Sequence, residues 1–473
     1  MSVKQFKTKK QGDQEFKERL QARPFIPVLW RPTTVNYDET EVRLSGSAGL
    51  GFITDLFCDD PLFEHFRECL PERRSNSSYD SEVFAMTTLL SIIEGHDCIE
   101  NIAGFEEDPF VLKKLGGAIP STFAMGDYYR DFTQENRDQL NDFLRRFARR
   151  ARKQVAPGEP LVIDIDSTSH VQRGLKMEGV EWNYKSQWCL DSLAAFDELG
   201  FCHGMELRPG RTFSSQGAPD LIGKVFNHLK HGDKKYLRAD SAFHNKDCVL
   251  ACVRAGASFT ITAHRNSTWE DQVKRGAIQS WTPWAYSKEE LEKAADQKIK
   301  LPTVELGSMV YRPGWSENLR FYVVVKRTLA KDKNGIEVWK YYAIVTNWNL
   351  FRIKLQSIVE FHQKRANSEN FIREEKWAYD FLHFPMQKLH ANHAYGLLGL
   401  VAHNLLRTIA LLHNRKRPLF AKALRRKFVH IPGRLVNSSS RWWIRIPAYY
   451  RKEVEDVVRG WAETLQSALA RAG

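Results

Sequence analysis

Two aspartates, Asp164 and Asp166, lie two residues apart in the apolar stretch LVIDIDSTSH, which spans positions 161–170. Side chains alternate across a strand, so both carboxylates leave by the same face, near the point where the run becomes polar. A buried carboxylate without a partner is costly, and a divalent cation at the strand edge is one way to satisfy two of them. Capping of a turn at the strand end is the alternative interpretation.

Two further acids stand where they could join this pair. Asp240 ends a short apolar strand in KKYLRADSAFHN, and Glu369 lies in the helical stretch HQKRANSENFIREEK. Three carboxylates brought together from two strands and a helix could hold two Mg²⁺ ions about 4 Å apart, with Mn²⁺ able to substitute. Such an ion pair activates a water or a 3′-hydroxyl and stabilises the leaving oxygen of a phosphoryl transfer.

The elements that must position these acids can be read from the periodicity of the apolar residues. Helical spacing dominates from 51 to 154, where Ala118 to Phe132 is consistent with a helix-turn-helix unit. The period then changes, and three successive strands are predicted at 161–169, 188–196 and 201–207. A helix, a strand, a helix and a strand follow, at 217–230, 236–240, 244–255 and 258–263. Three antiparallel strands followed by alternating helix and strand predict an RNase H-like α/β core with a mixed sheet.

The rest of the chain departs from this pattern. Residues 264–349 are rich in tryptophan and predict a β-rich insertion, with a hairpin that turns at Asn334-Gly335. Helices resume after it, and the chain ends in a basic region. The predicted segments are an N-terminal arm (1–50), a helical DNA-binding region (51–158), the first part of the core (159–263), the insertion (264–349), the second part of the core with Glu369 (350–410) and the basic C-terminal region (411–473).

The charge of the chain indicates a polyanionic partner. The net charge is +13 and the pI is near 9.3. Between Phe381 and Lys452 there are fourteen Lys or Arg and no Asp or Glu. This run favours nucleic acid over an acidic membrane surface, because nothing in the sequence indicates a lipid anchor. The DNA-binding residues predicted there are Arg415, Lys416, Arg417, Arg425, Arg426 and Lys427.

The cysteines and the apolar residues of the sequence indicate the cellular compartment of the protein. The seven cysteines are scattered without a CxxC pair, which favours reduced thiols over a structural zinc site. We find no apolar run of about 18 residues, and the N-terminus is charged where a signal peptide would be apolar. We therefore expect a soluble, cytoplasmic protein with no membrane partner.

The stretch around Glu369 resembles a known signature. HQKRANSENFIREEK is similar to the Tyr-x2-Arg-x3-Glu-x6-Lys signature of bacterial insertion-sequence DDE transposases, matching at Arg365, Glu369 and Lys376. His362 stands where that family has Tyr. IDIDSTS and LRADSAF match its first two acidic motifs, and MELRPGRT resembles the 1380-type branch.

The resemblance implies an enzyme that cuts the ends of its mobile element and joins them to target DNA. It implies the catalytic triad Asp166, Asp240 and Glu369, with Asp164 as the alternative first acid. It also implies double-stranded DNA partners, namely terminal inverted repeats and target DNA, a homodimer on paired ends, and a bacterial, nucleoid-associated location.

The same resemblance gives roles to residues that would contact DNA. Arg365, Lys376 and His362 would grip the phosphate beside the scissile bond, although a surface ion pair with Glu369 is the alternative for Arg365. An aromatic residue of the insertion would hold a flipped base, and Trp315 is our choice among the tryptophans. A DNA-binding protein without activity and a nuclease that does not join ends are the competing functions.

Overall fold

Residues 43–473 form one compact unit. The computed structural model describes residues 42–469 apart from 74–76, 175, 228, 230–232, 265–268, 317, 380, 382 and 439–440, and the side chains of 367–369, 375, 377 and 464–469 are also not described. The predicted N-terminal arm therefore lies largely outside the described residues.

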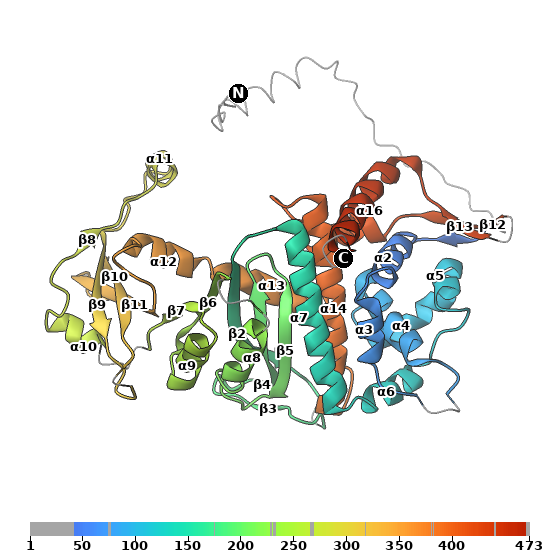
Figure 1. Cartoon of the computed structure of the whole chain (residues 1–473), viewed down its shortest axis with the longest axis horizontal. Helices are drawn as coiled ribbons and strands as arrows, with labels where there is room; N and C mark the ends of the chain where they lie inside the picture. The colour runs from blue at the N-terminus through green and yellow to red at the C-terminus, as the bar shows by residue number, and fades with distance from the viewer. Residues whose placement is uncertain are drawn as a thin grey trace, which may run out of the picture. The chain divides into compact units, whose positions relative to one another are not determined.

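A ten-stranded mixed sheet runs through this compact unit (Figure 1). β2 (Leu161–Val171) pairs antiparallel with β4 (Trp188–Asp197), which pairs antiparallel with β5 (Cys202–Pro209). On its other side β2 runs parallel to β6 (Lys235–Ala239), and β6 runs parallel to β7 (Ser258–Thr262). These five strands match the predicted ones, so the expected α/β fold with a mixed sheet is confirmed.

Alternating side chains place a different helical layer on each face of this sheet. Leu193 and Ala195 of β4 are buried in one core with α8 (Ala218–Phe226) and α9 (Lys246–Arg254). Phe196 of the same strand is buried in the other core, which contains α7 (Gln134–Val155) and α14 (Leu389–His413). In β2 it is Ile163 and Ile165 that join the α8–α9 core, so Asp164 and Asp166 leave by the opposite face.

The predicted β-rich insertion is part of the same sheet. β11 pairs antiparallel with β7, with Val345 opposite Ile261, and the sheet continues through β10 and β9 to β8. The hairpin of β10 and β11 turns where it was predicted, with Gly335 at a φ of 81°. The bounds are β8 Thr282–Pro283, β9 Val304–Tyr311, β10 Phe321–Lys331 and β11 Glu337–Thr346, with α10 Trp269–Lys274 before β8 and α11 Lys288–Asp296 between β8 and β9.

Residues predicted to be helical before the core are helical. Ser121 caps α6 by accepting a hydrogen bond from Ala124 N at 3.2 Å, and the ring of Tyr128 on α6 stacks on Phe84 with centroids 4.8 Å apart. These helices share one core with α7 and α14. They are α2 Gly49–Cys58, α3 Phe63–Glu68, α4 Ser81–Glu94, the 3₁₀ helix η1 Ile99–Glu106, α5 Pro109–Lys114 and α6 Thr122–Arg130.

α14 is long and apolar enough to cross a membrane, with a mean hydropathy of 1.4 over its most apolar window. This helix was not expected, because no membrane-spanning apolar run of about 18 residues was predicted from the sequence. In the structure 94% of that window is buried inside the protein, as expected for a core helix. His393, Asn404 and Thr408 are buried along α14, and each bonds to a backbone carbonyl.

The remaining elements complete the sheet edge, the second half of the core and the C-terminal region. Strand β1 pairs with β12, and β12 with β13, in a separate three-stranded sheet. The bounds are β1 Leu44–Ser45, β3 Glu181–Trp182, η2 Ser241–Phe243, α12 Leu355–Gln363, α13 Ala366–Ala378, α15 Ala421–Leu424, the π-helical η3 Arg425–Val429, β12 Gly433–Ser438, β13 Arg441–Arg445 and α16 Ala448–Leu469.

Candidate active site

Asp164 and Asp166 share a face of β2 but have different surroundings. Asp164 is 2% exposed and accepts two hydrogen bonds from Arg238 of β6, at 2.7 Å from Nε and 2.6 Å from Nη2. Burial raises the pKa of Asp164 to about 6, because Arg238 offsets only part of the desolvation. Asp166 keeps about a fifth of its side-chain surface exposed, at 21%, and it lines a cleft.

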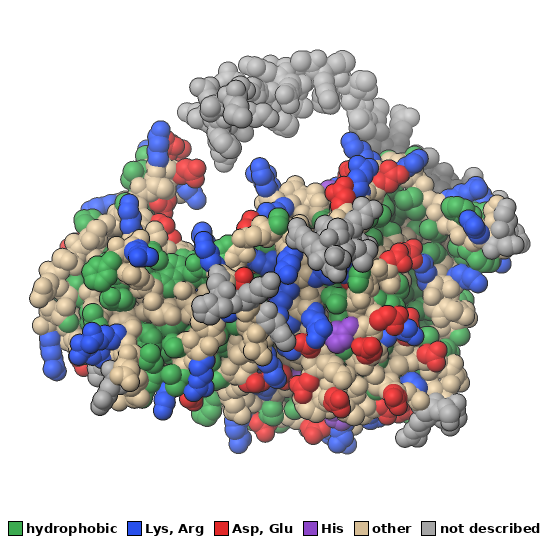
Figure 2. Space-filling model, viewed as in Figure 1, with side chains coloured by type: hydrophobic (Ala, Val, Ile, Leu, Met, Phe, Trp, Pro, Cys, Tyr) green, Lys and Arg blue, Asp and Glu red, His purple; other side chains and the backbone are tan. Residues whose placement is uncertain are grey.

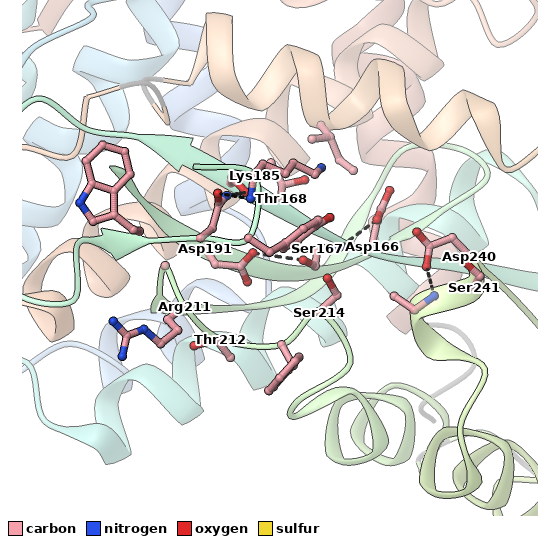
Figure 3. A pocket seen from close by; sticks show the side chains of 18 of the residues that line it. Asp166, Ser167, Thr168, Lys185, Asp191, Arg211, Thr212, Ser214, Asp240 and Ser241 are labelled. Atoms are coloured by element: carbon pink, nitrogen blue, oxygen red, sulfur yellow. Dashed lines mark hydrogen bonds between the residues drawn. The ribbon is translucent and has the colours of Figure 1, made fainter. Parts of the chain in front are cut away.

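Asp240 stands beside Asp166 because of the register of two parallel strands. Ile165 of β2 is paired with Ala239 of β6, so the next residue of each strand is an aspartate. Asp240 Oδ1 accepts a hydrogen bond from Ala242 N at 2.9 Å, which starts η2. Figure 3 shows the two carboxylates at the same end of the cleft.

The cleft has a volume of about 1000 Å³ and is lined by both carboxylates and by several cations. Carboxyl ends of adjacent parallel strands are a common place for ligand sites in α/β proteins. The lining Lys and Arg residues are Lys185, Arg211, Arg365, Arg373 and Lys376. The cleft therefore presents two oxygen ligands within a rim that attracts phosphate.

The helix that carries Glu369, together with the turn before it, contacts the strand that carries Asp166. Arg365 Nη1 lies 3.4 Å from Asp166 Oδ2, and Lys376 Nζ donates to Ser169 O at 2.9 Å. Between these contacts, Phe371 of α13 stacks on Phe196 of β4 with ring centroids 6.2 Å apart. The backbone of Glu369 therefore runs beside the acidic end of β2, while its side chain lies outside the described residues.

Arg365, Glu369 and Lys376 were predicted to share one continuous helix, and the structure corrects this. α12 ends at Gln363 and α13 begins at Ala366, so Arg365 lies in the turn between them, where its amide donates to His362 O at 3.0 Å. The turn lets the guanidinium approach β2 from outside the helix.

His362 is enclosed in the protein interior. It is 2% exposed, and its two ring nitrogens lie 3.0 Å from Thr260 Oγ1 and 3.0 Å from Thr262 Oγ1. Burial, with Arg365 and Arg238 nearby, lowers the pKa of His362 to about 3. The expected phosphate contact would require the imidazole to leave this place.

Comparison with known proteins now adds to the geometry. The family described as transposase DDE domain group 1 matches residues 31–468, which include Asp166, Asp240 and Glu369. The chain belongs to this DDE transposase family. No curated protein matches the chain.

The side chains of the transposase cleft suit a hard divalent cation. Asp166 and Asp240 offer carboxylate oxygens, which Mg²⁺ and Mn²⁺ prefer over nitrogen or sulfur. Within the described residues no group of three or more His, Cys, Asp or Glu is placed to hold a metal ion. A third ligand would have to come from Glu369, whose carboxylate is outside that part of the structure.

Trp315 of the transposase lies away from the cleft. Its ring is half-buried and packs against Phe321 of β10, with centroids 6.4 Å apart. Two other insertion tryptophans contact a cation: Arg327 lies over the rings of Trp281 and Trp339 at 3.9 Å and 4.3 Å. None of these rings is among the described residues that line the cleft.

The predicted basic residues of the C-terminal region fall into two groups. Arg415, Lys416, Arg417 and Arg426 are exposed. Arg425 is buried and donates to the carbonyls of Ile92, Ile93 and Ala378. Lys427 Nζ lies 2.8 Å from Glu453 Oε1, and Arg415 pairs with Glu159. Of these residues, Lys416, Arg417 and Arg426 can therefore reach DNA without breaking one of these contacts.

Basic side chains are not confined to that region. On the face shown in Figure 2, scattered Lys and Arg side chains with few acids lie among hydrophobic and other side chains over β9–β11, while acids and bases are intermixed over the helices on the other side.

Sequence reasoning missed a buried ion pair in the wall of the cleft. Arg208 Nε donates to Asp191 Oδ1 at 2.9 Å, and Ser167 Oγ donates to Asp191 Oδ2 at 3.1 Å. Burial raises the pKa of Asp191, and Arg208 opposes the shift. The signal was present, since Arg208 lies in the MELRPGRT motif and Asp191 interrupts an apolar strand.

Proposed function

We propose that this transposase cuts the ends of a mobile DNA element and joins them to target DNA by phosphoryl transfer in the cleft of Asp166 and Asp240, with Glu369 as the third carboxylate. One observation carries the proposal: the two aspartates directly follow the last paired residues of two parallel strands and line one cleft. The strand order β5-β4-β2-β6-β7 supports an RNase H-like core. Asp164 is not part of the proposed triad, because Arg238 holds both of its oxygens.

Asp166, Asp240 and Glu369 would hold two Mg²⁺ ions, or Mn²⁺ in their place, and such ions activate the attacking hydroxyl and neutralise charge on the leaving oxygen. The protein's own cations bind and orient the DNA. Arg365 offers a planar fork beside Asp166, while Arg373 and Lys376 line the same wall from α13. These groups place the scissile phosphate over the carboxylates, and orientation of this kind supplies much of the rate in phosphoryl transfer.

The proposed partners are duplex DNA at the terminal inverted repeats and at the target. A homodimer on paired ends is proposed because the element has two ends. The proposed location is the bacterial cytoplasm, on the nucleoid. The net charge of +13 supports a DNA partner.

The test is incubation of the purified chain with labelled ends of its own element, with Mg²⁺ or with a chelator, followed by sizing of the products. We expect nicks at the element boundary and joined strands with Mg²⁺ alone. Asp240→Asn should abolish both products and leave end binding near wild type, because only a metal-ligating oxygen is lost. Asp247→Asn is the matched control, since Asp247 is exposed on α9 seven residues further on and does not line the cleft.

The outcomes separate the candidate functions. Nicking by Asp240→Asn at the wild-type rate would overturn the proposed site. Nicks without joined strands would indicate a nuclease, and end binding without either product would indicate a DNA-binding protein.

A further inference from the structure

Two turns at the rim of the cleft each carry a large aromatic side chain that is exposed to solvent. Tyr184, in the turn between β3 and β4, is 84% exposed, and Phe213, in the loop after β5, is 82% exposed. Trp182, at the base of the first turn, is 60% exposed. All three line the same cleft as Asp166 and Asp240.

The first turn is tied to the strand of the catalytic aspartate. Asn183 Oδ1 accepts hydrogen bonds from the amides of Lys185 and Gln187, each at 2.9 Å, while Asn183 Nδ2 donates to Ser169 Oγ of β2 at 3.0 Å. Ser186 holds a φ of 56°, an uncommon conformation for a residue with a side chain. The position of Tyr184 is therefore set by a side-chain network rather than by packing of its own ring.

The second turn is held from below by the buried ion pair of the cleft wall. Arg208 bonds to Asp191 and also donates to the carbonyls of Ser214 and Gln216. Gln216 N donates back to Phe213 O at 2.9 Å. At the start of the turn, a Cβ on Gly210 would lie 2.0 Å from Cys189 O, so the close approach of the loop to β4 needs glycine.

Both turns add a cation beside the ring. Lys185 Nζ lies 5.3 Å from the centroid of the Tyr184 ring, and Arg211 is exposed two residues before Phe213. Figure 3 shows Arg211 on the far side of Asp191 from Asp240, so this rim lies along the cleft from the carboxylates. An exposed ring gives up the stabilisation that burial of such a side chain provides, so two of them on fixed turns indicate a ligand with flat apolar faces.

We propose that Tyr184 and Phe213 form a stacking platform for unpaired nucleobases of DNA beside the reacting phosphate. The inference rests on the proposed function and deepens it, because it specifies that this end of the cleft binds DNA in an unpaired state. A paired duplex hides its base faces in the helical stack and offers phosphates, for which the cations alone would suffice. Aromatic rings interleaved with Lys and Arg are what binds single strands, through stacking and phosphate contact together.

The test compares two DNAs of equal length, one fully paired and one with four unpaired bases at its centre, one of which is 2-aminopurine. Full-length protein is titrated in chelator, and binding is followed by anisotropy and by quenching of the 2-aminopurine. We expect Tyr184→Ala and Phe213→Ala each to weaken binding of the open DNA by between about fivefold and about 100-fold, as stacking on one ring predicts. The quenching should be lost, and affinity for paired DNA should change less than about twofold.

Two control variants sharpen the result. Tyr184→Phe keeps the ring and should restore both affinity and quenching. Phe351→Ala removes a ring that is 91% exposed but does not line the cleft, and it should change neither measurement.

Equal losses on both DNAs, or no loss on either, would overturn the platform while leaving wild-type nicking, and so the proposed function, intact. A change from dimer to monomer in Tyr184→Ala or Phe213→Ala, measured by light scattering, would overturn it in favour of a second copy of the chain. Failure of the wild type to bind any DNA would overturn both proposals.

Discussion

Asp164 and Arg238 face each other across two parallel strands, with both carboxylate oxygens of Asp164 bonded to the guanidinium at 2.7 Å and 2.6 Å. The pair lies two residues before Asp166 and Asp240 on the same strands. Arg238 Nη1 also donates to Phe361 O of α12 at 3.1 Å, so one buried guanidinium joins β2, β6 and the helix that leads to α13. The two aspartates of this strand therefore have different roles. Asp164 forms a structural ion pair, whereas Asp166 lines the cleft.

Arg238→Ala should lower the free energy of unfolding by about 3–5 kcal/mol, because it leaves the Asp164 carboxylate buried without its counter-charge. Urea unfolding measures this. The double variant Asp164→Leu, Arg238→Met should lose less than the single one, since no charge stays behind. Arg451→Ala, which removes an exposed pair with Glu455, should cost less than about 0.5 kcal/mol. Equal costs for Arg238→Ala and Arg451→Ala would contradict this account.

Lys376→Met should loosen α13 from β2, because the bond from Lys376 Nζ to Ser169 O is lost. We expect faster hydrogen exchange over residues 366–378 and a cost of about 1.5–3 kcal/mol, typical of a charge-assisted hydrogen bond. Lys364→Met, at an exposed lysine before the same helix, is the control. Unchanged exchange together with weaker DNA binding would instead assign Lys376 to phosphate contact alone.

Arg425 and Arg426 are neighbours with opposite expected effects. Arg425→Gln should destabilise the protein by several kcal/mol, since its buried guanidinium bonds to three backbone carbonyls. Arg426→Gln should leave stability unchanged and lower the slope of log affinity against log salt by about 0.9, the value for one phosphate contact. Thermal unfolding and salt titration of DNA binding measure the two. An unchanged slope in Arg426→Gln would place this residue away from DNA.

Acidification should destabilise the protein through its buried histidines. Burial lowers the pKa of His403 from 6.5 to about 4, and its Nδ1 has no hydrogen-bond partner among the described residues. The unfolded chain therefore takes up the proton first, so this contribution to stability is complete above pH 6.5 and is lost as pH falls toward 4. His393 shifts in the same direction, also to about 4.

His403→Gln keeps a donor for Gly200 O and removes the titration. At pH 5 the slope of unfolding free energy against pH should fall by about 1.2 kcal/mol per pH unit relative to wild type. Urea unfolding between pH 7 and pH 4.5 measures this slope. Equal slopes in the two proteins would show that His403 stays neutral in both states or is charged in both.

Local pattern determined most of the elements. The period-two run from Leu161, the helix from Ser121 and the hairpin at Asn334-Gly335 were all predicted, because side-chain alternation, caps and turn residues act over a few positions. The break between α12 and α13 was missed, since no Gly or Pro marks it. The joining of the insertion to β7 was also missed, because strand pairing across some 80 residues leaves no local signal.

The sequence by itself determined the family and predicted which acids act: Asp166, Asp240 and Glu369 stand in ordered motifs that resemble this family, and the family match covers them. Tertiary structure alone decided their partners. It paired Asp164 with Arg238, buried His362 and Arg425, and set Tyr184 and Phe213 at the rim of the cleft. The physical reason is that residue type fixes what a side chain can do, whereas burial and counter-charges, contributed by distant segments, fix what it is free to do.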